Sequence, residues 1–144
     1  MNNISFNNEG VATKTPSKRL LKAWIKEFVS SHGKKVGELA FIFCSDEKIL
    51  EVNQNFLQHD YYTDIITFDY CEGELVSGDI FISVERVAEN ATSHNVEYKE
   101  ELLRVLAHGV LHLIGFQDKS HKKKKEMTEN EDLCISLFLT KFAQ

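Results

Sequence analysis

The stretch HGVLHLIGFQD, at residues 108–118, says most about both the fold and the chemistry of this chain. On an α-helix, residues i and i+4 lie one turn apart on the same face, so His108 and His112 can point at one metal ion. Gly115 can end this helix, because glycine readily takes the left-handed conformation that helix C-termini favour. The chain can then turn back and present Asp118 as a third ligand, so the stretch predicts a metal site at the end of a helix.

The spacing H-x3-H-x2-G-x2-D is similar to the metal site of the metzincin proteases, whose last ligand is usually histidine. Metalloproteases carry a glutamate directly after the first histidine as general base, and this chain has Gly109 there. We therefore expect a metal-activated water but no peptidase chemistry. The glycine is also expected to leave space above the metal, which suits a bulky phosphodiester.

Two imidazoles and a carboxylate, with a fourth position open, are a typical ligand set for catalytic zinc, so we expect one Zn²⁺ per chain. Imidazole also suits nickel, copper and iron, and the spacing does not choose among them. His121 is the alternative to Asp118 as third ligand. A last helix that begins near residue 120 would turn His121 away, which leaves it as a candidate substrate or proton contact.

The segments around this site predict an α+β fold in a single domain over residues 1–144, with a four-stranded mixed sheet and about five helices. The last two strands are close enough in sequence to form a hairpin. Strands are expected near residues 4–6, 36–44, 64–70 and 78–83, and helices near residues 16–32, 46–57, 84–91, 96–114 and 120–141.

Capping residues and apolar periodicity predict where the helices begin and which faces they bury. Thr15 and Pro16 are expected to open the first helix, Ser45 the second and Ser83 the third. The expected buried stripes are Leu20, Leu21, Trp24, Ile25 and Phe28 in the first helix, Leu102, Val105, Leu106, Val110 and Leu113 in the metal helix, and Met127, Leu133, Leu137 and Phe138 in the last.

Composition favours a cytoplasmic protein without a membrane partner. No apolar run approaches the roughly 20 residues that cross a bilayer, and the first fifteen residues lack the basic and apolar order of a signal peptide. The three cysteines (Cys44, Cys71 and Cys134) form no CxxC pair and are expected to be small hydrophobic residues.

The net charge of −5 argues against a general nucleic-acid coat. Lys119 and the run Lys122–Lys125, however, directly follow the metal stretch. A lysine run is usually a solvated helix face, but beside a candidate active site a role in contacting phosphate is equally favoured.

Three blocks of sequence resemble the YbeY-type rRNA-maturation endoribonucleases. Residues 108–118 follow the family signature, roughly HGxLHLxGYDH, and YTDIITF at residues 62–68 is similar to the family's PTDVLSF. GDIFI at residues 78–82 matches the family's GDI and the apolar residues after it. The blocks stand in the family's order and spacing, so the resemblance covers the chain from the strand at residues 36–44 onward.

The resemblance implies a zincin-like fold, bound zinc and cleavage of single-stranded RNA in ribosome assembly and quality control, including maturation of the 16S rRNA 3′ end. It also implies ribosomal RNA and ribosomal particles as partners. The acidic net charge disfavours tight RNA binding by the chain alone, so we expect a ribosome-associated protein to deliver specificity. Two alternatives remain: a non-catalytic ribosome-assembly factor stabilised by a metal, and a metal-dependent hydrolase with a substrate other than RNA.

Three positions depart from the family pattern. Asp118 stands where the family has its third metal-binding histidine, and Phe116 where it has tyrosine. Leu57 stands where an arginine often follows an aromatic residue, which leaves open how the substrate phosphate is held. Arg104, one turn before His108, can substitute for that arginine, as can Lys119 and Lys122 in the lysine-rich stretch.

The general base stays open, because no glutamate follows His108. The substrate 2′-OH, a hydroxide on the metal, Asp64 or Asp79 can take the proton. For both aspartates and for Thr63, hydrogen bonds in turns at strand starts are the alternative role.

Overall fold

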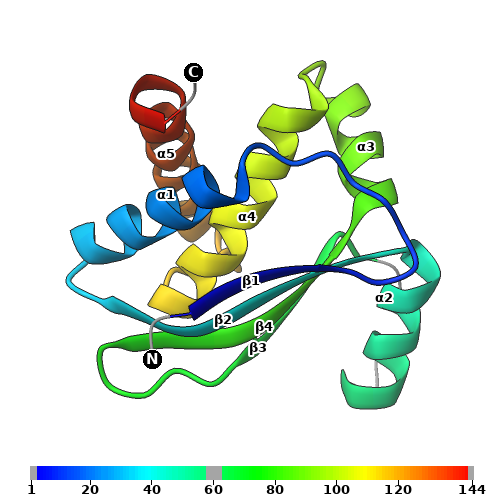
Figure 1. Cartoon of the computed structure of the whole chain (residues 1–144), viewed down its shortest axis with the longest axis horizontal. Coiled ribbons are helices and arrows are strands. Elements are labelled where there is room, and N and C mark those ends of the chain that lie inside the picture. Colours follow the sequence, from blue (N-terminus) through cyan, green and yellow to red (C-terminus); the bar gives the residue numbers. More distant parts are fainter. Residues whose placement is uncertain (1–2, 58–62, 143–144) are drawn as a thin grey trace.

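The computed structural model describes residues 3–57 and 63–142, in which four strands and five α-helices form the elements seen in Figure 1. Two π-helical turns, η1 (Asn53–Leu57) and η2 (Phe138–Phe142), continue α2 and α5. The elements are β1 (Asn3–Asn8), α1 (Lys18–Ser31), β2 (Lys35–Cys44), α2 (Asp46–Val52), β3 (Ile65–Asp69), β4 (Leu75–Ser83), α3 (Val84–Ser93), α4 (Tyr98–Ile114) and α5 (His121–Leu137).

The strands form one sheet in the order β1-β2-β4-β3. β1, β2 and β4 run parallel, and β3 pairs with β4 in the antiparallel direction. The four-stranded mixed sheet and the hairpin of the last two strands are therefore confirmed. Because β3 is paired on one side within this sheet, it forms one of the two sheet edges.

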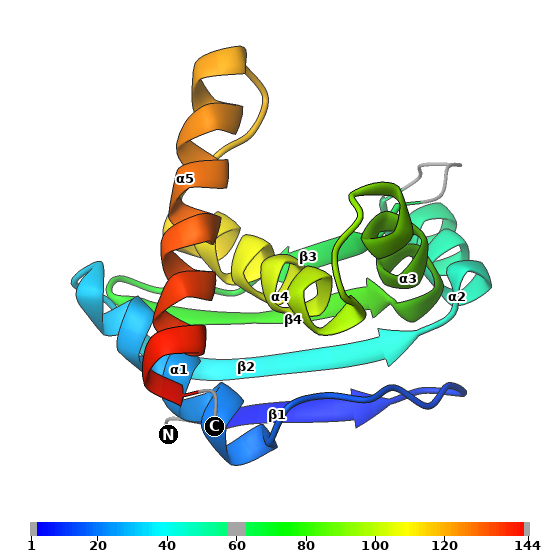
Figure 2. The same cartoon turned by 90° about the horizontal axis from the view of Figure 1, so that it is seen from above.

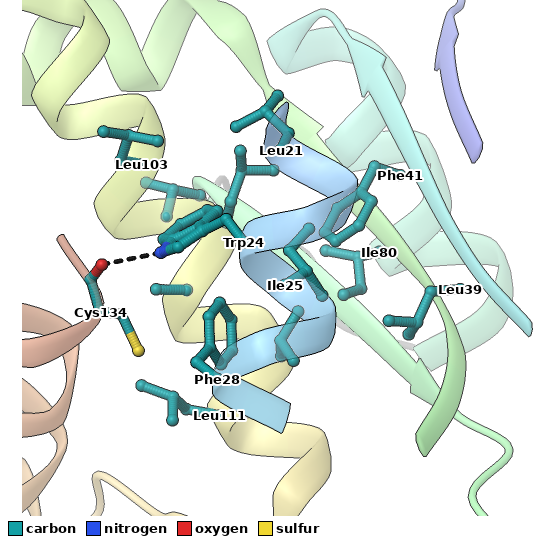
Figure 3. Close-up of a cluster of buried hydrophobic side chains, with 14 of the residues drawn as sticks. Leu21, Trp24, Ile25, Phe28, Leu39, Phe41, Ile80, Leu103, Leu111 and Cys134 are labelled. Carbon is teal, nitrogen blue, oxygen red and sulfur yellow. Dashed lines mark hydrogen bonds between the residues drawn. The ribbon is translucent and has the colours of Figure 1, made fainter. Parts of the chain in front are cut away.

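Helices α1, α4 and α5 lie over one face of the sheet, and α5 projects beyond it in the second view (Figures 1 and 2). Trp24 of α1 is fully buried between Phe28 and Phe138, with ring centroids 5.1 and 5.4 Å away. Its indole Nε1 donates a hydrogen bond of 2.7 Å to the carbonyl oxygen of Cys134, as Figure 3 shows. This bond fastens α5 to α1 through the core.

A smaller apolar cluster lies apart from the main core, where α2 packs against the sheet. Cys44 of β2 is buried there with Ile49, Val52 and Ile66. In the same strand Phe41 belongs to the main core. Strand β2 is thus apolar on both faces, as expected for a central strand.

The observed caps confirm two expectations and correct one. The hydroxyls of Ser45 and Ser83 accept hydrogen bonds from Lys48 N and Arg86 N, as predicted for helix N-caps. The first helix instead begins after Ser17, whose hydroxyl accepts from Leu20 N at 3.4 Å. The prediction that Thr15 and Pro16 open this helix was wrong, because a serine two residues later supplies the capping oxygen.

The buried face of α5 also differs from the expectation. Leu133 is 68 % exposed, although it was predicted to be buried. The residues that face the core recur at i, i+4, i+7, i+8 and i+11, and position 133 falls on the opposite side of the helix. They are Met127, Glu131, Cys134, Ile135 and Phe138.

The three cysteines are free thiols. Burial raises the pKa of Cys44 and of Cys134 to about 12, so both stay protonated at neutral pH. This agrees with their expected role as small hydrophobic residues. Among the described residues, no helix combines the length and apolar character needed to cross a membrane.

Candidate metal centre

His108 and His112 lie on α4 with their ring centroids 6.1 Å apart. The helix that carries them is held firmly, since its other residues supply much of the main core. The predicted stripe of apolar residues is confirmed: Leu102, Val105, Leu106, Val110 and Leu113 are all buried.

The turn after α4 fixes the ring of His112. Gly115 takes a φ of 129° and ends the helix, with its N–H donating to the carbonyls of Leu111 and His112. The chain then turns back so that the carbonyl oxygen of Phe116 lies 2.9 Å from His112 Nδ1. Since a carbonyl can only accept, Nδ1 carries the proton and Nε2 keeps its lone pair.

The carboxylate of Glu131 fixes the ring of His108 in a similar way. Its Nδ1 lies 2.7 Å from Glu131 Oε2, while its Nε2 lies 3.5 Å from Asp118 Oδ2. Burial lowers the pKa of His108, but the hydrogen bond and charge of Glu131, with the charges of Asp118 and Asp64, raise it above its ordinary value overall.

Glu131 in turn binds Arg104. One guanidinium nitrogen lies 2.9 Å from Glu131 Oε1, and another lies 2.7 Å from Asp132 Oδ1. Burial lowers the pKa of Arg104, but the hydrogen bonds that it donates to Asp132 and Glu131 raise the pKa overall. Arg104, predicted as a substrate contact, is thus engaged by two carboxylates of α5.

A pocket of about 320 Å³ opens where these groups meet. One wall carries the predicted ligands, and the other consists of edge strand β3 and η1. Leu57 lines this second wall, where the family often has arginine. The lining residues are Asn53, Leu57, Thr63, Asp64, Ile65, Ile66, Thr67, His108, His112 and Asp118. Tyr62, the first residue of the YTDIITF block, lies outside the described residues.

The two aspartates considered as general base are separated by the sheet. Asp64 lines the pocket of the histidines and accepts a hydrogen bond of 3.3 Å from Asn90 Nδ2. Asp79 accepts from the Tyr70 hydroxyl and lines a different pocket, with Phe56, Phe68 and Phe81. A role for Asp79 as base at the metal is therefore not supported, because its side chain points to the other face of β4.

Gly109 does not face the pocket opening, contrary to expectation. A Cβ atom there would lie 2.9 Å from Ile65 Cδ1 and 3.1 Å from Ile80 Cγ2. The missing side chain lets α4 approach the sheet closely, and any side chain here would require Ile65 and Ile80 to shift. The glycine therefore serves helix–sheet packing rather than space above a metal.

The basic residues after the turn lie on the surface. Lys119, His121 and Lys122 are exposed, and Ser120 caps α5 by accepting from Lys123 N at 3.1 Å. His121 is the first residue of α5 and does not line the pocket, which favours Asp118 as third ligand.

The donor chemistry of the pocket fits a divalent metal. Both imidazoles are held through Nδ1, which is how proteins usually orient metal-binding histidines. Both therefore keep the lone pair of Nε2 free to bind a metal. Asp118, 40 % exposed, adds a carboxylate. Within residues 3–57 and 63–142, no group of three or more such side chains is arranged to hold a metal as it stands. His112 is the exposed member of this donor set, whereas His108 and Asp118 are half-buried.

Glu131 is the functional candidate that the sequence reasoning missed. Its signal lies in the α5 stripe, where a glutamate recurs with Met127 and Cys134 at buried positions. A carboxylate is rarely buried without a partner, so its place in an apolar stripe predicts a bound cation or donor.

Comparison with known proteins gives a consistent assignment. The family described as Endoribonuclease YbeY matches residues 3–138. Endoribonuclease YbeY of Phocaeicola vulgatus is 52 % identical over 134 residues, which are 93 % of this chain and 97 % of that protein. The Bacteroides thetaiotaomicron protein of the same name is 49 % identical over 93 % and 98 %. A solution structure from Thermotoga maritima matches with a TM-score of 0.65 and 33 % identity, covering 92 % of this chain and 87 % of that one.

Proposed function

The chain belongs to the endoribonuclease YbeY family, and we propose that it is a zinc-dependent endoribonuclease acting on single-stranded RNA in ribosome maturation. Membership confirms the resemblance inferred from three motifs. The observation that carries the metal dependence is the state of the two imidazoles. Phe116 holds Nδ1 of His112, and Glu131 holds Nδ1 of His108. Both Nε2 atoms are thereby left to donate a lone pair to a metal.

His108, His112 and Asp118 would hold the ion, one per chain. When bound, zinc supplies a Lewis acid for a phosphoryl oxygen and lowers the pKa of a bound water to about 7. Asp118 places a carboxylate where the family has its third histidine, so the net charge of the site is lower by one.

The other residues of the pocket handle the substrate. We assign Asp64 as the acceptor of the proton from the attacking group, because it lines the pocket and Asn90 orients its carboxylate. The wall formed by β3 and η1 would receive the ribose-phosphate chain. Lys119, His121 and Lys122 are exposed and follow Asp118 closely in the sequence. They would contact phosphates farther along the RNA.

The substrate is proposed to be ribosomal RNA, including the 3′ end of 16S rRNA, within ribosomal particles in the cytoplasm. A net charge of −5 gives little general attraction for polyphosphate. A ribosome-associated protein would therefore contribute to bringing enzyme and substrate together.

The test uses protein freed of metal by a chelator and then supplied with Zn²⁺. The substrate is a single-stranded fragment of the 16S rRNA 3′ region, compared with the same sequence in a duplex. We expect cleavage of the single strand, dependent on Zn²⁺, and a loss of more than about 100-fold in Asp118→Asn, since ligand loss exceeds the effect of outer-shell changes. Asp69→Asn, at an exposed position that does not line the pocket, is the matched control and should cleave normally.

Equal cleavage by Asp118→Asn and the wild type, with equal zinc content, would remove Asp118 from the ligand set. Absence of cleavage by a zinc-loaded wild type that still binds ribosomal particles would favour the non-catalytic assembly factor. Cleavage of a casein control instead of RNA would favour a hydrolase with another substrate.

A further inference from the structure

We propose that Glu131 and Arg104 act as a positioning relay for His108, so that helix α5 sets the metal affinity of a site whose ligands lie outside it. This inference rests on the proposed metal site and goes beyond it. Neither residue would touch the metal. Glu131 would fix the imidazole of His108, and Arg104 would fix Glu131.

The two oxygens of Glu131 are each committed to one partner. Oε2 lies 2.7 Å from His108 Nδ1, and Oε1 lies 2.9 Å from Arg104 Nη1. The side chain is 8 % exposed, so water gives little competition for either oxygen. The carboxylate therefore has one well-defined orientation, with a single oxygen directed at the imidazole.

This orientation has a direct chemical consequence for His108. An Nδ1–H that donates to a carboxylate fixes the tautomer in which Nε2 keeps its lone pair, and it makes that nitrogen a stronger donor. Nε2 is the nitrogen on the side of Asp118, 3.5 Å from its Oδ2. Glu131 acts from the opposite side of the ring, so it positions the ligand without contacting the metal or substrate.

Arg104 makes the buried carboxylate tolerable. A carboxylate removed from water is strongly unfavourable unless it is paired and hydrogen-bonded. Arg104 precedes His108 by one turn of α4, so both side chains can reach the same residue of α5. Its second contact, 2.7 Å to Asp132, holds the guanidinium from the solvent side.

The position of Glu131 is fixed by the packing of α5. Met127 one turn before it and Cys134 one turn after it are buried. The carbonyl of Cys134 accepts the hydrogen bond of 2.7 Å from Trp24 Nε1. These contacts fix the α5 backbone on both sides of Glu131, so the carboxylate is presented to α4 from a packed helix.

The experiment measures Zn²⁺ affinity by competition with a chromophoric chelator, with thermal unfolding of the metal-free protein as the measure of folding. Glu131→Gln should weaken Zn²⁺ binding by about 10- to 100-fold, the usual effect of removing an outer-shell partner. Glu129→Gln is the matched control, because the same change falls on an exposed position of the same helix. It should leave Zn²⁺ affinity unchanged.

Arg104→Gln tests whether the relay is serial. Alone it should weaken Zn²⁺ binding, but in combination with Glu131→Gln it should add little, because Arg104 acts through Glu131. Effects that multiply in the double variant would overturn the relay. So would unchanged Zn²⁺ affinity in Arg104→Gln with a raised KM for RNA, which would assign Arg104 to the substrate phosphate.

The controls separate this inference from the proposed function. A wild-type protein that fails to bind Zn²⁺ contradicts the proposed function, whereas equal Zn²⁺ affinity in wild type and Glu131→Gln contradicts the relay alone. If Glu131→Gln does not fold, Glu131→Asp and Arg104→Lys keep the charges and alter the geometry. They should also weaken Zn²⁺ binding, and unchanged affinity in both overturns the relay.

Discussion

The two walls of the pocket are built in opposite ways. On the α4–α5 side, polar side chains are hydrogen-bonded to one another and largely withdrawn from solvent: Glu131 is 8 % exposed and His108 is 25 % exposed. On the η1 side, the apolar side chain of Leu57 is 37 % exposed, and its neighbour Phe56, which lines the separate pocket of Asp79, is 70 % exposed. The first wall buries a charged side chain, whereas the second exposes an apolar one.

This difference separates two tasks. A metal ligand must be held within a fraction of an ångström, which requires packed helices and a supporting shell of hydrogen bonds. A wall that binds an RNA chain must be open to solvent, and it does not require the same precise positioning of its side chains. The comparison predicts that changes on the α4–α5 wall disturb folding or metal binding, whereas changes on the η1 wall disturb only RNA binding.

The largest effect is expected at Gly109, where α4 meets the sheet. Gly109→Glu would force a side chain against Ile65 and Ile80 and bury a carboxylate, with a loss of stability of about 3 kcal/mol or more. Gly109→Ala is the control and should lose much less. Urea unfolding measures both. A stable Gly109→Glu would mean that this position faces the pocket after all.

A smaller effect is expected where α5 is anchored. Trp24→Phe removes the indole hydrogen bond to the Cys134 carbonyl, which then accepts only from Phe138 N, and leaves a void, at a loss of about 2 kcal/mol. Leu133→Ala, on the exposed face of the same helix, should change stability by no more than about 0.5 kcal/mol. Equal losses in the two variants would contradict the assigned buried face of α5.

On the open wall, Leu57→Arg should leave stability within about 0.5 kcal/mol of the wild type. It places a guanidinium at the pocket, so we expect RNA to bind about 5-fold more tightly at low salt, with the gain lost at high salt. Leu139→Arg makes the same change on exposed η2, outside the pocket. A similar gain in RNA affinity in Leu139→Arg would mean that the added positive charge attracts RNA from anywhere on the surface, and not through the pocket.

The smallest effect concerns protons in the metal-free protein. The pKa of His108 is raised in the folded state. Above pH 6.5 the unfolded chain therefore binds fewer protons at this histidine than the folded chain does. The stabilisation is therefore complete below pH 6.5 and is lost as the pH rises through the folded pKa. Urea midpoints from acid to alkaline pH, in a chelator, should show this decline, and His108→Gln should show a weaker one. A midpoint that rises over this interval contradicts the assignment.

The sequence contained the local features of this site and lacked the long-range ones. The positions of His108 and His112 follow from helical spacing, and the end of their helix follows from Gly115, since both depend on neighbours in the chain. The family resemblance came from motifs of the same local kind. The fold class followed from the alternation of apolar patterns.

The contact between Glu131 and His108 joins residues on different helices, and no spacing rule predicts it. The same limit explains the errors. The role of Gly109 depends on Ile80 of a distant strand, and the exposure of Leu133 depends on how α5 is rotated against α4. Each needs tertiary packing, which local periodicity constrains only weakly.

The most direct test of the central claim compares zinc content and RNA cleavage in the wild type and His112→Ala, purified side by side. We predict about one zinc per chain and cleavage of single-stranded ribosomal RNA for the wild type, and loss of both in the variant. Equal cleavage by the two proteins would indicate a contaminating nuclease and contradict a metal-dependent active site at His112.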